Sequence, residues 1–566
     1  MRAWSVTVLI VSAMLIQTTS WKVCAASRVV PSLESCHHHE DWWSANERLL
    51  WLSVCRGDSH VFGGTKPAPG PTLTKISGRF LEALFTKKPY SDSLTHSPVE
   101  FNNLEITSPI RLTSVNIEGL RFKNSDFDDI VDLSDSHFSG SLSFIGTSFL
   151  HGLCARRILV AGSIILGAVD MDAAHADQTP VKRVKIGNLL NTCSSTDRAV
   201  PSIDANTSSI GGGLFIRGAV LSGPIALSGI HVAGELDMEG VQGHEVWLSS
   251  ATVSGQVVIV DSEFSTTGAR EGGDEPTLLN LFELHTAKSV FLNRSTFDAD
   301  IYAEESNIEG SLYMTGASLS RISLRNATIG EALSFGANYH KGMSTTVTRW
   351  SKTAVLDLSH AKINEIFAPR NFDYWPNNIN FTDFTVTSFV SGNIKMPDRS
   401  VDEASWFPQW LSHSSEKKYS PQPYQTVISL LNNEGSPSAA AAVGYAGKER
   451  EREEACESWK IDDCLYLWLA RMLIGYGYKI WLSIGWSALL VIVGALVFQQ
   501  TPESKLYHMP FGFSYSFDML LPIIKLRELH YKIELAGPTR YYFYFHKLAG
   551  WVLGSFIVAA VSGITK

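Results

Sequence analysis

The chain has 566 residues, more than one hydrophobic core usually organises, so several structural units are expected. The formal net charge of −9 argues against a nucleic-acid partner, because proteins that neutralise a phosphate backbone carry a concentrated basic surface. With 45% hydrophobic and 18% charged residues, the composition is that of a mostly water-soluble protein with a short membrane portion.

Residues 1–26 have the pattern of a secretory signal peptide. A basic residue, Arg2, precedes an apolar run over 4–16, and a polar stretch follows that ends in Cys24, Ala25 and Ala26. The apolar run is too short for an ordinary spanning helix. We therefore expect export with cleavage after Ala26, an uncleaved anchor being the alternative.

Six cysteines remain after this cleavage, and they fall into three pairs that are local in sequence. The simplest connectivity is Cys36–Cys55, Cys154–Cys193 and Cys456–Cys464. Such pairing indicates an oxidising compartment. The alternative is six buried free thiols.

Residues 27–99 are expected to form an N-terminal helical cap, with helical patterns over 42–55 and 76–86. The run 36–41 (Cys-His-His-His-Glu-Asp) collects potential metal ligands. A zinc site needs ligands that converge tetrahedrally, which consecutive histidines on one short segment seldom do. We therefore assign no metal ligands and interpret the run as a solvated, disulfide-tethered terminus.

Residues 100–392 contain a repeat. Near its start, apolar pairs separated by one outward residue recur every five residues, as in Val115 with Ile117 and Leu120 with Phe122. Further along, similar pairs recur every ten or eleven residues. Glycines precede these later pairs at matching offsets, and a corner of a repeat needs a residue that tolerates φ > 0. The glycines are Gly212, Gly223, Gly234 and Gly255.

This spacing predicts a mainly β protein built on a right-handed, pentapeptide-like β-helix, a solenoid of roughly 21 residues per turn. Insertions are expected around 174–209, 264–286 and 336–352. A stack of strands exposes unpaired edges at both ends, so helical caps are expected there. Residues 393–463 fit this role as a linker and a helical hairpin.

Residues 464–566 are expected to form a membrane domain with two transmembrane helices, at about 480–498 and 548–564. The segment 464–474 is shorter and contains Arg471, so we expect it to lie along the membrane interface. The loop between the spans is rich in lysine and arginine, which favours a cytoplasmic loop and a solenoid outside. The alternative is the inverted topology, which the basic cluster Lys448, Arg450 and Arg452 before the first span would favour.

Several C-terminal motifs resemble those of a bacterial family of pentapeptide-repeat membrane proteins with two C-terminal transmembrane helices. The motifs lie at 419–426, 475–478, 515–522, 546–551 and 562–566, and the resemblance covers roughly the last 170 residues. It implies a protein of the bacterial inner membrane. Some members are labelled membrane-associated oxidoreductases, which implies a redox activity, although the sequence contains no dinucleotide fingerprint, CxxC or flavin-type motif.

The segment 511–529 between the spans has two interpretations. With Tyr515, Ser516, Asp518 and Pro522, it resembles in outline the re-entrant segment of a pore, where a buried charge must be paired or face a water-filled lumen. Alternatively, it is an amphipathic helix on the cytoplasmic face, in which Asp518 faces water and tolerates replacement by Asn.

No residue of the sequence is assigned a catalytic, cofactor-binding or metal-binding role. The favoured interpretation is a non-enzymatic scaffold or binding protein, anchored in the inner membrane with its β repeats facing the periplasm or cell exterior. Its expected partners are the lipid bilayer and another protein or a cell-envelope polymer, with homo-oligomers as a further possibility. An oligomeric ion-conducting pore is the first alternative and a membrane-associated oxidoreductase the second.

Overall fold

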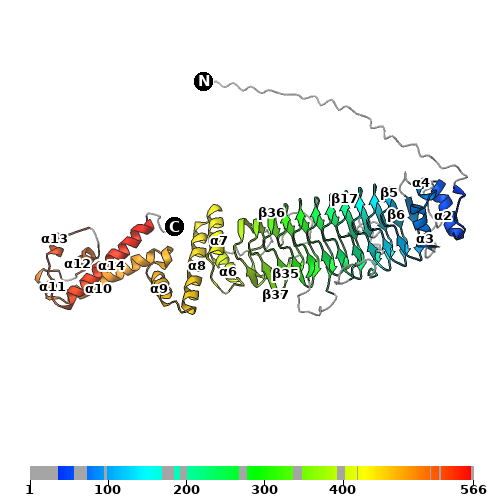
Figure 1. The fold of residues 1–566 in the computed structure, drawn as a ribbon. Coiled ribbons are helices and arrows are strands. Elements are labelled where there is room, and N and C mark those ends of the chain that lie inside the picture. Colours follow the sequence, from blue (N-terminus) through cyan, green and yellow to red (C-terminus); the bar gives the residue numbers. More distant parts are fainter. Residues whose placement is uncertain are drawn as a thin grey trace, which may run out of the picture.

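The computed structural model describes most of the chain beyond the N-terminal segment. The described residues are 36–56, 73–94, 99–167, 184–190, 200–266, 277–335, 347–391, 402–416, 418–509, 512–521 and 524–561. Figure 1 shows a long β body with helices α2–α4 at one end and helices α6–α14 at the other. The expected signal peptide lies outside the described residues.

The strands of the body form two parallel sheets, each with twenty described strands. The first sheet begins with β1 (Thr74–Ile76), β3 (Leu104–Ile106), β4 (Ile110–Arg111), β7 (Asp126–Phe127), β8 (Val131–Asp132), β11 (Ser148–Phe149), β12 (Leu153–Cys154), β15 (Val184–Ile186), β16 (Ile203–Asp204) and β19 (Ala219–Leu221). It continues with β20 (Ile225–Ala226), β23 (Gln242–Gly243), β24 (Val246–Trp247), β27 (Glu263–Phe264), β28 (Thr277–Asn280), β31 (Thr296–Phe297), β32 (Asp300–Tyr302), β35 (Ser318–Ser323), β37 (Arg349–Asp357) and β39 (Asn378–Asn380).

The second sheet begins with β2 (Val99–Asn102), β5 (Asn116–Ile117), β6 (Leu120–Lys123), β9 (His137–Phe138), β10 (Leu142–Ile145), β13 (Leu159–Val160), β14 (Ile164–Gly167), β17 (Ser209–Ile210), β18 (Leu214–Arg217) and β21 (His231–Val232). It continues with β22 (Leu236–Asp237), β25 (Thr252–Val253), β26 (Val257–Val258), β29 (His285–Thr286), β30 (Val290–Phe291), β33 (Asn307–Ile308), β34 (Leu312–Tyr313), β36 (Thr328–Ser334), β38 (Lys362–Phe367) and β40 (Thr385–Val390).

Each strand pairs in parallel with a strand well further along the chain rather than with its neighbour in sequence. Leu142 is opposite Leu120 on one side and Ile164 on the other, and Leu214 is opposite Leu236. These partners are 22 residues apart, close to the spacing expected from the repeat. The chain therefore returns to each sheet once per repeat, and backbone hydrogen bonds join successive repeats along the body.

The predicted fold class is wrong in two respects. First, the strands are divided between two parallel sheets of twenty, rather than forming a single β-helix solenoid. The sequence did not predict this division, because the recurrence of apolar pairs shows which side chains point inward but not which strands share hydrogen bonds. The expected pair of transmembrane helices is also not found: within the described residues, one helix, α10 (Trp481–Gln499), is long and apolar enough to cross a membrane.

The interior of the β body is filled by side chains that stack on equivalent side chains of neighbouring strands. Phe101, Phe122 and Phe144 form one such column, with adjacent ring centroids 5.1 and 5.8 Å apart. Phe127 and Phe149 form a second, 5.0 Å apart. Burying each ring stabilises the body by about 1.5–3 kcal/mol, and one repeat could not bury its apolar row without its neighbours.

The repeat glycines have a different role from the one expected. Gly212, Gly223, Gly234 and Gly255 do not have positive φ, whereas corner residues such as Asp135 do. At Gly255 an added Cβ would lie 2.4 Å from the carbonyl oxygen of Gly234. Close approach of adjacent backbones therefore requires glycine at this position.

Helices α2 (Ala45–Arg56), α3 (Gly78–Thr86) and α4 (Tyr90–Leu94) cover the first end of the body, in the segments where a helical cap was expected. Glu47 is buried between α2 and α3. Its carboxylate accepts hydrogen bonds from Ser44 N (2.7 Å), Ser77 N (2.8 Å) and Ser77 Oγ (2.6 Å). Burial acts to raise the pKa of Glu47, but these hydrogen bonds outweigh it and lower the pKa below its ordinary value.

Helices α6 (Glu403–Ser412), α7 (Pro421–Asn433) and α8 (Pro437–Glu457) cover the other end. Trp410 of α6 packs edge-on against Phe381, with ring centroids 4.7 Å apart. The helices also satisfy backbone groups of the last strands: Glu434 accepts a hydrogen bond from Phe389 N, and Gln422 donates one to the carbonyl of Phe384. This covering prevents the final strands from pairing with another chain.

The remaining helices form a separate group beyond α8. They are α9 (Ile461–Ile474), η2 (Gly475–Gly477), α10 (Trp481–Gln499), α11 (Pro502–Leu506), α12 (Phe513–Leu520), α13 (Glu528–Tyr531) and α14 (Pro538–Val561), while a short helix, η1 (Phe372–Tyr374), lies within the β body. The second predicted span, about 548–564, overlaps the C-terminal part of α14, and its last residues lie outside the described residues. This helix begins with a polar and aromatic segment that includes His546 and Lys547, and it does not reach the hydropathy of α10.

Candidate membrane-proximal site

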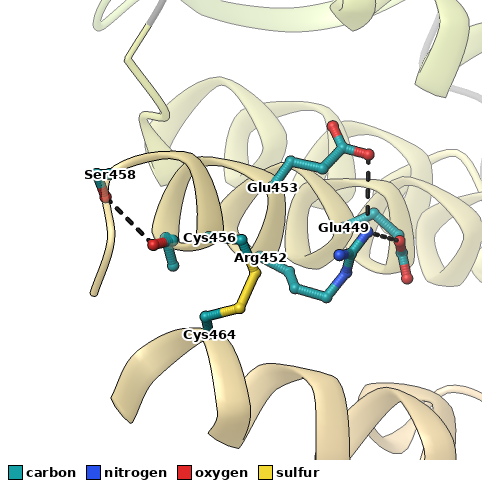
Figure 2. Close-up of a disulfide and its surroundings, with 7 residues drawn as sticks. Glu449, Arg452, Glu453, Cys456, Ser458 and Cys464 are labelled. Carbon is teal, nitrogen blue, oxygen red and sulfur yellow. Dashed lines mark hydrogen bonds and ion pairs between the residues drawn. A yellow bond between two sulfur atoms is a disulfide. The ribbon is translucent and has the colours of Figure 1, made fainter. Parts of the chain in front are cut away.

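A disulfide joins the β body's last capping helix to the helices beyond it. Cys456 lies in the last turn of α8 and Cys464 in the first turn of α9, with Cα atoms 4.9 Å apart (Figure 2). Between them the chain reverses direction through Trp459, which has a φ of 58°. The disulfide therefore restrains the angle at which α9 leaves α8.

Ion pairs reinforce the same junction. Glu449 of α8 contacts Arg452 on its own helix, as Figure 2 shows, and Arg471 of α9, each at 3.1 Å. Burial, followed by the influence of the nearby Glu449 carboxylate, raises the pKa of the phenol of Tyr476, in the turn after α9. A single carboxylate on α8 thus pairs with an arginine of its own helix and with one of α9.

The two faces of α9 differ in chemistry. One face packs against α8 and carries three residues spaced three and four positions apart. On this face Cys464 is disulfide-bonded, Leu467 is buried and Arg471 pairs with Glu449. The opposite face is exposed and apolar. It carries Leu465, Trp468, Leu469 and Met472. This division is typical of a helix that lies in a membrane interface. The interfacial position of this segment stays a prediction.

The apolar helix α10 follows at a fixed angle. The turn η2 contains two glycines with positive φ, Gly475 and Gly477, which allow the chain to reverse sharply. Ser483 of α10 donates a hydrogen bond to the Leu473 carbonyl (3.1 Å), and the Trp486 indole donates one to the Met472 carbonyl (2.9 Å). The exposed apolar face of α9 therefore adjoins the exposed apolar surface of α10.

The residues assigned to a possible pore lie in the interior of the C-terminal helices. Tyr515, Ser516 and Asp518 of α12 are buried, and Pro522 lies outside the described residues. The Tyr515 ring stacks on Phe498 of α10, with centroids 4.1 Å apart. The expectation that Asp518 faces water is wrong.

Asp518 is the centre of a hydrogen-bond network. Its Oδ1 accepts from Leu526 N (2.9 Å), and its Oδ2 accepts from Arg527 N (3.1 Å) and pairs with His530 Nδ1 (2.8 Å). Burial acts to raise the pKa of Asp518, but these three hydrogen bonds outweigh it and lower the pKa below its ordinary value. The carboxylate ties α12 to the segment that begins α13.

Two buried histidines of this network were missed from the sequence. His530 pairs with Asp518, and His546 of α14 contacts the Ser516 carbonyl through Nε2 (3.1 Å). Helix α12 also packs closely against α10, since a Cβ added at Gly494 of α10 would lie 2.2 Å from Ser516 Oγ of α12. His546 follows a run of aromatic residues, which was an available sequence signal, whereas His530 lies among charged residues and gave none. The contacts of both histidines with α12 depend on tertiary structure.

Two of the three predicted disulfides are confirmed, Cys36–Cys55 and Cys456–Cys464. Cys154 is buried and disulfide-bonded, but its expected partner, Cys193, lies outside the described residues. Within the described ranges, no group of three or more His, Cys, Asp or Glu side chains is arranged to hold a metal ion.

Comparison of the chain with protein-family models, curated proteins and solved structures gives no match.

Proposed function

We propose that the protein is a non-enzymatic scaffold or binding protein that displays its β body on the oxidising side of a membrane. In a bacterial cell, as the sequence resemblance implies, this side is the periplasm or cell exterior. The apolar helix α10 crosses the bilayer and α9 lies in the interface. The observation that carries this proposal is the position of the disulfides, because Cys36–Cys55 and Cys456–Cys464 enclose the β body at both ends.

The β body has the features of a rigid display surface. Its core is continuous, and its outward face carries ion pairs between successive repeats, such as Arg157 with Asp135 (2.6 Å) and Arg294 with Asp261. Each exposed pair contributes little to stability. Together they present a regular array of charged and polar groups, which suits another protein or a cell-envelope polymer as partner.

The alternatives have less support. A pore that uses Asp518 requires this carboxylate to face a lumen, whereas three donors from the following segment already occupy it. An oxidoreductase activity rests on the family resemblance alone.

Two measurements on the native membrane fraction test the proposal. Proteolysis without reduction, followed by mass spectrometry, should recover linked peptides containing Cys36 with Cys55 and Cys456 with Cys464. The protein should also remain with the bilayer after an alkaline carbonate wash, which removes peripheral proteins. Complete alkylation of these cysteines without reduction, together with release by carbonate, would refute both parts of the proposal.

A further inference from the structure

We propose that a pocket where α8, α9 and α10 meet binds the headgroup phosphate of an anionic phospholipid in the outer leaflet. This inference rests on the proposed function, because it requires α10 to be in the bilayer with the junction on its outer side.

The pocket has a volume of about 480 Å³ and contains two cationic side chains, Arg471 of α9 and Lys479 before α10. Its described lining includes no acidic residue. Glu449 pairs with the Nε atom of Arg471, and the Arg471 side chain remains 44% exposed. The ion pair with Glu449 thus fixes the Arg471 guanidinium, while the side chain stays partly exposed and lines the pocket.

Lys479 is positioned by an aromatic ring. Its Nζ lies 4.0 Å from the centroid of the Tyr445 ring, and Tyr445 also lines the pocket. A cation–π contact orients the ammonium group without neutralising its charge. Two oriented cations on one open pocket provide charge complementarity for a phosphate monoanion.

The rest of the pocket is apolar and continues onto α10. Trp481 is 66% exposed, and Leu489, two turns further along the helix, is also exposed. Trp486 lies between them in the sequence and donates its indole N–H to the Met472 carbonyl. Tryptophans beside cationic groups at the start of an apolar helix are typical of the headgroup level of a bilayer. The acyl chains of a lipid held at Arg471 and Lys479 would lie along α10 and contact its exposed apolar side chains. A free phosphate or a soluble anion has no acyl chains and could not make these contacts.

The test compares lipids bound by full-length protein in detergent, measured by native mass spectrometry. The probes are phosphatidylglycerol and phosphatidylcholine, with inorganic phosphate as competitor. We expect phosphatidylglycerol to bind more tightly than phosphatidylcholine, and Lys479→Gln to weaken the binding of phosphatidylglycerol about 5-fold, the effect of roughly one interfacial cation. Lys352→Gln removes an exposed lysine on β37 of the β body and should leave lipid binding unchanged.

A second variant separates the pocket from general charge. Gly485 lines the pocket and an added Cβ there meets no atom within 4 Å, so the larger side chain of Gly485→Leu should occupy part of the pocket and also weaken the binding of phosphatidylglycerol. Equal affinity for both lipids, or unchanged binding in both pocket variants, would overturn the headgroup site. Displacement by millimolar inorganic phosphate would show a phosphate site that is not specific for lipid. Release of the wild-type protein by carbonate would instead refute the proposed function.

Discussion

Replacing Asp518 by Asn tests whether this buried carboxylate holds the C-terminal helices together. Asn keeps the size of the side chain but replaces one acceptor oxygen with an NH₂ group. If NH₂ occupies the Oδ1 position, the Leu526 amide loses its acceptor; if it occupies the Oδ2 position, Arg527 N and His530 lose theirs. The less costly case is the first, in which the Leu526 amide is left without its acceptor and the negative charge of the carboxylate is lost. We expect this to cost about 1–3 kcal/mol.

The cost should appear locally. The backbone amides of Leu526 and Arg527 donate directly to Asp518, so hydrogen exchange measured by mass spectrometry on the peptide over 524–531 reports on the network. When exchange follows the opening equilibrium, about 1.4–2.8 kcal/mol corresponds to roughly 10- to 100-fold faster exchange. The matched control is Asp463→Asn on the exposed first turn of α9, which should leave this peptide unchanged.

Exchange of this peptide within about twofold of wild type in the Asp518→Asn protein would refute the reasoning, since effects that small are typical of exposed sites. It would restore the interpretation in which Asp518 faces water.

Two further predictions concern the β body and its cap. The pKa of Glu47 is lower in the folded protein than its ordinary value of 4.5, so its contribution to stability should be fully present above that value and be lost as pH falls through the folded-state pKa. Glu47→Gln weakens the hydrogen bonds from Ser77 and should lower the free energy of unfolding at neutral pH by about 1–3 kcal/mol. It should also remove this part of the acid dependence of stability, which urea unfolding across pH measures. An unchanged acid dependence would contradict the prediction. Gly255→Ala should destabilise the body by about 1–3 kcal/mol, because the new Cβ meets the backbone of Gly234. In the control variant Gly485→Ala on α10, the new Cβ meets no atom within 4 Å, so this change should be neutral or stabilising. Equal shifts of the melting temperature in both variants would contradict the close approach of backbones at Gly255.

The sequence predicted local features better than the arrangement of the strands. Apolar pairs such as Leu120 and Phe122 correctly indicated buried positions and a repeat near 21 residues, since burial and strand alternation leave a direct imprint on residue types. The division of strands between two sheets depends on hydrogen bonds between residues far apart in the chain, which this pattern does not encode.

The candidate sites show the same division. The local cysteine pair at 456 and 464 could be predicted because only a short turn separates the two residues. The environment of Asp518 could not, because the groups that satisfy it come from α13 and the segment before it, and helix periodicity alone allowed a solvent-facing position. The second span was likewise misjudged, since the apolar stretch from about 548 is only part of a helix that begins at Pro538.

The central claim is that the β body and the α8–α9 junction lie on the outer side of a membrane that α10 crosses. Protease added to sealed spheroplasts that express the protein tests it most directly, with fragments identified by mass spectrometry. The account predicts that the β body over 99–391 is digested without lysis and that a fragment containing Trp481–Gln499 is protected. Full protection of the β body in sealed spheroplasts, with digestion only after lysis, would contradict the account and place the body in the cytoplasm.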